Sequence, residues 1–302
     1  MKNEIFVENE YIETYKINKD NIKILVISDI HYHEHTNKML YDTLYNYIIK
    51  SLPNYIVIPG DIIDTYKVLN NIESKKFLNY FFKSISEISK VIMVPGNHDI
   101  VNFNIKNYLN NDYQNNYLSM NYLYNLNKIN NIYFLNNEQV KLDDIVFTGL
   151  NLRHETYLKY KDKYTNDLFI KDYINNNFKI DNNLYNILLC HNPMPLFDEY
   201  ILNSVEDINY YDLSICGHFH DGFIPKLFDK YIKNTNIGIF TMPFILPYPG
   251  IECRGLHKAG DRFIFISQGF KKFGNDNILY NILDKFSSHD IEELNIRKKI
   301  LK

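Results

Sequence analysis

The sequence has few cysteines and no excess of either charge, and these absences exclude several classes of protein. Cys190, Cys216 and Cys253 are the only cysteines in 302 residues, too few for a disulfide framework or for a zinc site built on thiolates. The 33 basic residues are balanced by 36 acidic ones, which gives a net charge of -3. No overall field therefore draws the protein toward nucleic acid or an anionic membrane.

Long apolar runs are also absent from the sequence. No stretch reaches the roughly 18 consecutive apolar residues that a membrane helix needs. Residues 1–19 carry Glu and Lys where a signal peptide would have an apolar core. We therefore expect no membrane span and a location in the reducing cytoplasm, while the sequence gives no indication of the oligomeric state.

The sequence does contain enough apolar residues for a core. Hydrophobic residues make up 45% of the chain, and this figure includes the 15% that are aromatic. Short β-branched runs at 22–27, 55–58 and 91–94 alternate with stretches of helical period. One helical stretch begins near Met39 and ends before Pro53, and the other runs over 77–88. This strand–helix–strand order predicts a parallel sheet.

The second half of the sequence predicts further strands and some antiparallel pairing. These strands are expected at 132–135, 145–150, 186–190, 213–216, 237–241 and 263–267. Residues 139–150 have the polar pair Asp143 and Asp144 at their centre, which suits a hairpin, so we expect mixed sheets.

No internal repeat and no Pro/Gly/Ser linker divides the sequence. We interpret residues 1–302 as a single domain. Residues 102–131 are rich in Asn and Tyr, but their Tyr and Leu residues recur at intervals that predict a helical insertion on the surface.

Polar clusters follow directly on five of the predicted strands. They are Asp29-Ile30-His31, Gly60-Asp61-Ile62-Ile63-Asp64, Gly96-Asn97-His98-Asp99, His191-Asn192-Pro193 and Gly217-His218-Phe219-His220. In open α/β sheets the carboxyl ends of the strands meet at one crevice, where ligands bind. The five clusters are therefore expected to lie together.

The residue types in these clusters favour divalent metals, because carboxylate, imidazole and side-chain amide groups suit Mn, Fe or Zn. Asp29 and His31 are two residues apart, as are His218 and His220, so on extended backbone the side chains of each pair face the same side. A glycine precedes Asp61, Asn97 and His218, and we expect it to let the chain turn sharply as it leaves the strand.

The ordered set of clusters resembles the signature of the calcineurin-like metallophosphoesterases, including their bacterial members. The motifs D-x-H, G-D-x-x-D, G-N-H-D/E, a lone H and G-H-x-H all occur in order between residues 29 and 220. The resemblance implies an α/β fold, namely a four-layer α/β/β/α sandwich of two mixed sheets flanked by helices. It also implies a dinuclear metal centre at the strand ends.

The resemblance further implies a role for each motif residue. One metal would be held by Asp29, His31, Asp61 and His220, and the other by Asp61, Asn97, His191 and His218, so that Asp61 bridges. His98 would face the substrate as a general acid, and Asp64 would be the carboxylate that orients it.

Several residues have a simpler interpretation beside the functional one. Asp64 and Asp99 could each cap the helix that follows, and for Asp99 we favour the cap. His33 and His35 lie near the site in sequence, but solvated loop histidines are common, and we leave them out of it.

Two further features stay open at the sequence level. Arg153 and His154 could contact a substrate phosphate, although a surface salt bridge is favoured. Residues 240–250 contain three prolines and form either a loop over the crevice or an inert connection.

The function implied by the resemblance is metal-dependent hydrolysis of a phosphoester, with a hydroxide bridging two metals as the nucleophile. The slightly acidic chain favours a small phosphodiester or phosphomonoester over nucleic acid as the substrate. The alternatives are a nuclease of the same family and a non-catalytic interaction scaffold on this fold.

Overall fold

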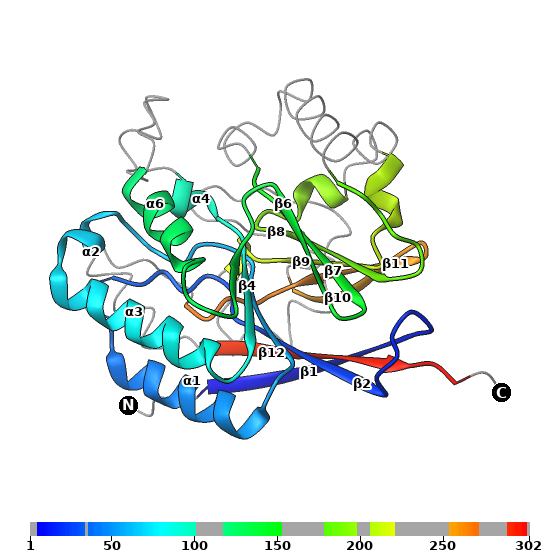
Figure 1. Ribbon diagram of the computed structural model, residues 1–302, viewed down its shortest axis with the longest axis horizontal. Coiled ribbons are helices and arrows are strands. Elements are labelled where there is room, and N and C mark those ends of the chain that lie inside the picture. The colour runs from blue at the N-terminus through cyan, green and yellow to red at the C-terminus, as the bar shows by residue number, and fades with distance from the viewer. Residues whose placement is uncertain are drawn as a thin grey trace, which may run out of the picture.

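The computed structural model of the protein describes residues 5–33, 36–100, 117–152, 178–197, 206–220, 254–271 and 289–300. Within these residues the strands form two sheets of six strands each (Figure 1). The first sheet has the order β1 (Ile5–Thr14), β12 (His289–Lys298), β2 (Asn21–Val26), β3 (Tyr55–Ile58), β4 (Lys90–Met93) and β5 (Ile132–Phe134). The second has the order β10 (Gly255–Ala259), β11 (Arg262–Ile266), β9 (Leu213–Cys216), β8 (Tyr185–Cys190), β7 (Ile145–Leu150) and β6 (Glu138–Leu142).

Both sheets are mixed, as predicted. Strands β2 to β5 are parallel, whereas β12 runs antiparallel to β2. In the second sheet β7, β8, β9 and β11 are parallel, and the edge strands β6 and β10 are antiparallel to their neighbours. The pairing of β6 with β7 confirms the hairpin expected at 139–150.

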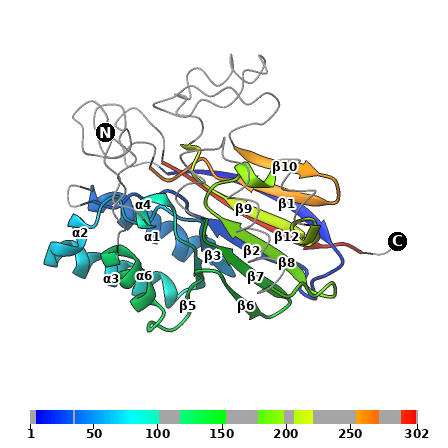
Figure 2. The ribbon, with the colours of Figure 1, turned by 90° about the horizontal axis from the view of Figure 1, so that it is seen from above.

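The helices of the first half cover the outer face of the first sheet. They are α1 (Lys38–Ser51), α2 (Lys67–Asn70), α3 (Ile72–Ser86) and α6 (Tyr117–Leu126), whereas the short α4 (Asn97–Ile100) begins soon after the end of β4 (Lys90–Met93). The side chain of Asn37 caps α1 by accepting a hydrogen bond from Met39 N–H, and Asn71 caps α3 in the same way through Glu73 N–H and Ser74 N–H. Figure 2 shows α1, α3 and α6 on one side of the molecule, away from β8, β9 and β10.

Apolar side chains fill three layers. One lies between the helices and the first sheet and includes Leu44, Leu78 and Phe82. The central layer is contributed by both sheets, with Val57 from one and Phe147 from the other. The third lies on the outer face of the second sheet, where the short helices η1 (Met194–Leu196) and η2 (Glu206–Tyr210) are found. The molecule is thus an α/β sandwich of two mixed sheets, as the resemblance implied.

Strands β1, β12 and β10 are additions to the elements expected from the sequence. Strand β12 lies between β1 and β2, yet it carries Asp290, Glu292 and Glu293 as buried residues. Buried charged side chains are rare in strands, so the apolar pattern that identifies a strand is missing here. Strand β1 is an edge strand in which Ile12 is the only buried residue, so its apolar residues do not mark a buried strand.

Some expectations lie outside the described residues. These are the strand at 237–241, the loop at 240–250, and the residues His35, Arg153 and His154. Of the insertion expected at 102–131, the described part contains helix α6. None of the described helices is long and apolar enough to cross a membrane.

Candidate metal centre

The predicted site residues come together at the carboxyl ends of five strands, as expected. In the order β2, β3, β4, β8 and β9, the loops after these strands carry Asp29 and His31; Asp61 and Asp64; Asn97 and His98; His191; and His218 and His220. All are buried except His98 and His218, which are partly exposed. Backbone hydrogen bonds join neighbouring loops, since Asp29 N–H donates to Gly60 O at 3.2 Å and His31 N–H to Asp61 O at 2.9 Å.

The backbone of the site is left-handed at many of these positions. The φ angles are 54° at Asp29, 42° at His31, 51° at Asp61, 74° at His218 and 46° at His220. The prediction that the two i,i+2 pairs lie on extended backbone is therefore wrong. Left-handed backbone costs a non-glycine residue about 1–3 kcal/mol and persists only where the surroundings enforce it.

Glycines allow these loops to pack closely. Gly60 has a φ of 100°, which agrees with the expected sharp turn after β3. Gly217 is required for a different reason, because a Cβ there would overlap Ser28 Oγ and would lie 2.6 Å from Asp29 Oδ2. The loops of the two sheets therefore contact one another directly at Gly217.

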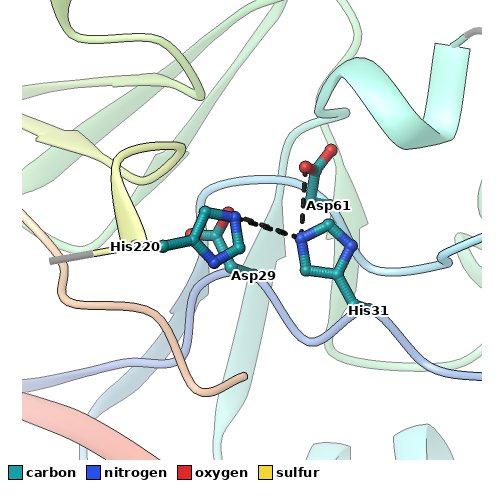
Figure 3. Close-up of side chains that lie close together, drawn as sticks. All are labelled: Asp29, His31, Asp61 and His220. Atoms are coloured by element: carbon teal, nitrogen blue, oxygen red, sulfur yellow. Dashed lines mark hydrogen bonds and ion pairs between the residues drawn. The ribbon is translucent and has the colours of Figure 1, made fainter. Parts of the chain in front are cut away.

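The first cluster consists of Asp29, His31, Asp61 and His220, whose ligand atoms all lie within 4.8 Å of one another. His220 Nε2 is 3.3 Å from His31 Nε2 and 3.1 Å from Asp29 Oδ1. Figure 3 shows the imidazoles of His31 and His220 turned toward each other, with the two carboxylates beside them. This is the set that the resemblance assigns to one metal.

The second cluster consists of Asp61, His191 and His218. Asp61 Oδ2 lies 3.2 Å from His191 Nε2 and also 3.5 Å from His31 Nε2, so one carboxylate oxygen faces both clusters. Asn97 adjoins this cluster through the chain, because the N–H of the next residue, His98, donates to Asp61 Oδ1 at 2.8 Å. The arrangement has the form expected of a bridging carboxylate.

A third group joins His98 to the first cluster through Asp64. Asp64 Oδ1 lies 3.5 Å from His98 Nδ1 and 3.5 Å from His31 Nδ1. His98 Nδ1 also lies 3.1 Å from the backbone oxygen of Asp64. Asp64 is thus placed to orient His98, and it contacts a residue of the first cluster at the same time.

The charges of the site oppose the effects of burial. Burial raises the pKa of Asp29 and of Asp61, but the surrounding histidines together lower it by more, through their charges and hydrogen bonds; His220 contributes most at Asp29 and His191 most at Asp61. Burial lowers the pKa of His191, but the charge and hydrogen bond of Asp61, together with the charge of Asp29 and the hydrogen bond to Pro59 O, raise it to about 9. Burial and the neighbouring His191 lower the pKa of His218 to about 3. The carboxylates are therefore ionised, and a metal bound here would displace a proton from His191.

Asp99 lies within α4, and its hydrogen bonds to the described residues join two loops instead of capping a helix. Its carboxylate accepts hydrogen bonds from the N–H groups of Gly96 at 2.9 Å, Ile62 at 3.2 Å and Ile63 at 3.0 Å. Burial and the charge of Asp61 raise the pKa of Asp99 to about 7. Asp99 therefore ties the loop after β3 to the loop after β4, and its place at the end of the Gly-Asn-His-Asp motif is the sequence signal for this role.

The side chains present fit two divalent metal ions. The clusters offer carboxylate oxygens and imidazole nitrogens without a thiolate, which suits hard or borderline divalent metals. Asn97 Oδ1 is a buried oxygen that receives no hydrogen bond from any described residue. A buried acceptor of this kind is costly unless it has a partner, and a metal ion would supply one.

The remaining residues near the site lie outside the clusters. His33 is buried, with 8% of its surface exposed, so the expectation of a solvated loop histidine is wrong. Cys190 and Cys216 are buried free thiols whose sulfurs are 3.6 Å apart, in agreement with their interpretation as core residues.

Comparison with known proteins identifies a family. Residues 22–222 match the family of calcineurin-like phosphoesterases. No curated protein matches the sequence.

Several solved structures are similar to this chain. A dimetal phosphatase from Danio rerio is 13% identical, with a TM-score of 0.40, over 82% of this chain and 87% of that one. GAP50, the anchor in the inner membrane complex of Plasmodium, is 13% identical, with a TM-score of 0.39, over 86% of this chain and 76% of that one. The nuclease MPE of Pseudomonas putida is 11% identical, with a TM-score of 0.33, over 83% and 77%.

Proposed function

Since the chain belongs to the calcineurin-like phosphoesterase family, we propose that it hydrolyses a phosphoester of a small molecule with two divalent metal ions held in the two clusters. Asp29, His31, Asp61 and His220 would hold one ion. Asp61, Asn97, His191 and His218 would hold the other.

The observation that carries this proposal is the position of Asp61. Its Oδ2 faces His31 Nε2 at 3.5 Å and His191 Nε2 at 3.2 Å, so a single carboxylate belongs to both clusters. Such sharing is what two adjacent metal ions require, and two ions together are suited to phosphoryl transfer. When bound, they would supply a nucleophile from water at neutral pH and neutralise the charge of the phosphate.

The residues around the two clusters would then position the substrate and move a proton. His98 is partly exposed, and its pKa is raised because the charges of Asp61 and Asp64 outweigh the lowering by burial. A histidine held in its protonated form can donate a proton to the departing alkoxide. Asp64, 3.5 Å from His98 Nδ1, would hold the ring in place for that transfer.

A small substrate is favoured by the charge of the chain. A net charge of -3 gives the chain as a whole no attraction for a polyanionic nucleic acid, whose tight binding rests on many basic residues. Metal ions bound in the two clusters would add positive charge at the site itself, which suits a phosphate group of a small molecule.

The test is an activity screen of protein reconstituted with Mn²⁺, Fe²⁺ or Zn²⁺. The panel would contain phosphomonoesters, cyclic nucleotides, nucleotide-sugar pyrophosphates and oligonucleotides, with Asp61→Asn protein as the matched control. We expect metal-dependent turnover of one of the small substrates by the wild type only. Preferential cleavage of oligonucleotides would show a nuclease, and metal binding without any turnover would show a scaffold.

A further inference from the structure

The five residues after β11, Ser267 to Lys271, form a turn that we call the 267–271 turn, and it lies against the first cluster. Phe270 N–H donates to Ser28 O at 2.7 Å, and Lys271 N–H donates to Asp29 O at 3.1 Å. Lys271 O lies 2.9 Å from His220 Nδ1, which leaves Nε2 of that ring to face the cluster. Lys271 Nζ also donates to His31 O at 3.4 Å.

This turn therefore supports three residues of the first cluster. Gly269 completes the contact, since a Cβ at that position would lie 3.3 Å from Asp29 Cβ and 3.6 Å from His220 Nδ1. The second cluster is supported from elsewhere, because His191 Nδ1 lies 2.8 Å from Pro59 O, in the loop after β3. His220 of the first cluster and His191 of the second are thus held by different parts of the backbone.

Strand β12 holds the turn in place through Glu292. Glu292 is 1% exposed, and its carboxyl group accepts hydrogen bonds from Gln268 N–H at 2.8 Å and from Ser267 Oγ at 2.8 Å. Ser267 Oγ in turn accepts from Gly269 N–H at 3.2 Å. The buried side chain of Glu292 thereby fixes the first three residues of the 267–271 turn, although Glu292 lies at least 21 residues away from them along the chain.

We propose that Glu292 is a positioning residue for the first metal site, acting through the 267–271 turn on Asp29, His31 and His220. This inference rests on the proposed function, because it assumes that both clusters hold metal. Residues that orient metal ligands typically change metal affinity by 10- to 100-fold when they are removed. Loss of Glu292 should therefore weaken the first site by roughly that factor and leave the second nearly unchanged.

The experiment measures the affinity of each site for Mn²⁺ separately, by competition with a chromogenic chelator. His191→Ala protein retains the first site, and His220→Ala protein retains the second. Glu292→Ala should raise the dissociation constant of the first site, measured in His191→Ala protein, by roughly 10- to 100-fold. It should raise that of the second site, measured in His220→Ala protein, by less than about 3-fold. Glu292→Gln keeps an acceptor for Gln268 N–H and should restore most of the affinity.

The control is Glu293→Ala on the same strand. Glu293 is 6% exposed and accepts from Tyr47 OH at 2.6 Å, on the face of the sheet that α1 covers. Its removal is expected to lower stability but to leave both metal affinities within about 3-fold. If Glu292→Ala does not fold, Ser267→Ala removes the same link more mildly and should weaken the first site in the same direction.

Two outcomes would overturn the inference. One is an unchanged affinity of the first site in Glu292→Ala protein, and the other is equal weakening of both sites. Failure of the proposed function gives a different result, since wild-type protein would then either bind fewer than two metal ions or bind two without any turnover, and neither result depends on Glu292.

Discussion

The two sheets contribute different chemistry to the metal centre. The segments after strands of the first sheet carry the candidate oxygen ligands Asp29, Asp61 and Asn97 together with a single candidate imidazole, that of His31. Loops of the second sheet supply imidazoles, those of His191, His218 and His220. Neither sheet holds either cluster by itself, so the proposed centre requires the two layers to pack in the correct register.

Contacts between the loops of the two sheets also depend on particular residues. His218 N–H donates to Asp29 Oδ2 at 3.2 Å, which joins a loop of the second sheet to a carboxylate of the first. Gly217 makes that approach sterically possible. Since both sheets contribute to each cluster, we expect metal binding and the packing of the two sheets to depend on each other.

The largest expected effect follows from replacing the ligand that both clusters share. Asp61→Ala should abolish tight binding of both metals and lower activity by at least about 10⁴-fold, or more than about 5 kcal/mol in the activation barrier. Metal analysis and a phosphoesterase assay would measure the two losses. Retention of one metal at full affinity would show that Asp61 serves a single site.

A second effect concerns His98, which lies in α4, just after a strand of the first sheet, and is not among the proposed metal ligands. His98→Ala should retain both metals and lose roughly 10²- to 10⁴-fold in rate on alkyl esters, because the alkoxide then leaves without a proton. On nitrophenyl esters, whose leaving group is weakly basic, the loss should be much smaller where chemistry limits the rate. Equal losses on both substrates would instead indicate that His98 positions the phosphate.

A third effect tests the dependence of sheet packing on metal. Since ligands from both sheets meet at each ion, Mn²⁺ at 100 times its dissociation constant should stabilise the fold by about 2.7 kcal/mol per site. Calorimetry with and without metal would show a rise in Tm of roughly 5 °C or more. An equal rise in Asp61→Ala protein would show that the metal binds elsewhere.

The smallest effect concerns pH and Glu292 in the metal-free protein. Burial, together with the charges of Asp290 and Glu8, raises the pKa of Glu292 to about 8. Between about pH 4.5 and 8 the unfolded chain loses this proton while the folded chain keeps it, so the free energy of unfolding should fall as pH rises through that range.

Glu292→Gln should reduce this slope, by at most about 1.4 kcal/mol per pH unit. Urea unfolding of both proteins at pH 5, 6, 7 and 8 would measure the difference. The variant should gain stability relative to the wild type as the pH rises, and parallel curves would contradict the raised pKa.

The sequence predicts the ligands better than the framework that holds them. Each ligand follows an apolar strand and belongs to a short motif, so residues such as Asp29 and His191 are visible without a structure. Strand β12 is hidden because its buried Glu292 and Glu293 break the apolar pattern.

The support of the site is also hidden, for a different reason. The 267–271 turn acts mainly through backbone groups, as in the bond from Phe270 N–H to Ser28 O, and backbone groups leave no mark on residue type. The left-handed φ of 42° at His31 is enforced by packing and is likewise invisible in a motif.

Asp61 is the one carboxylate that we propose to join two metal sites built from both sheets. The most direct test is the electron paramagnetic resonance spectrum of protein loaded with two equivalents of Mn²⁺. Two ions that share Asp61 should show the broadened spectrum of a magnetically coupled pair, and Asp61→Ala protein should not show this broadened spectrum. A simple six-line spectrum of isolated Mn²⁺ in fully loaded wild-type protein would contradict the account.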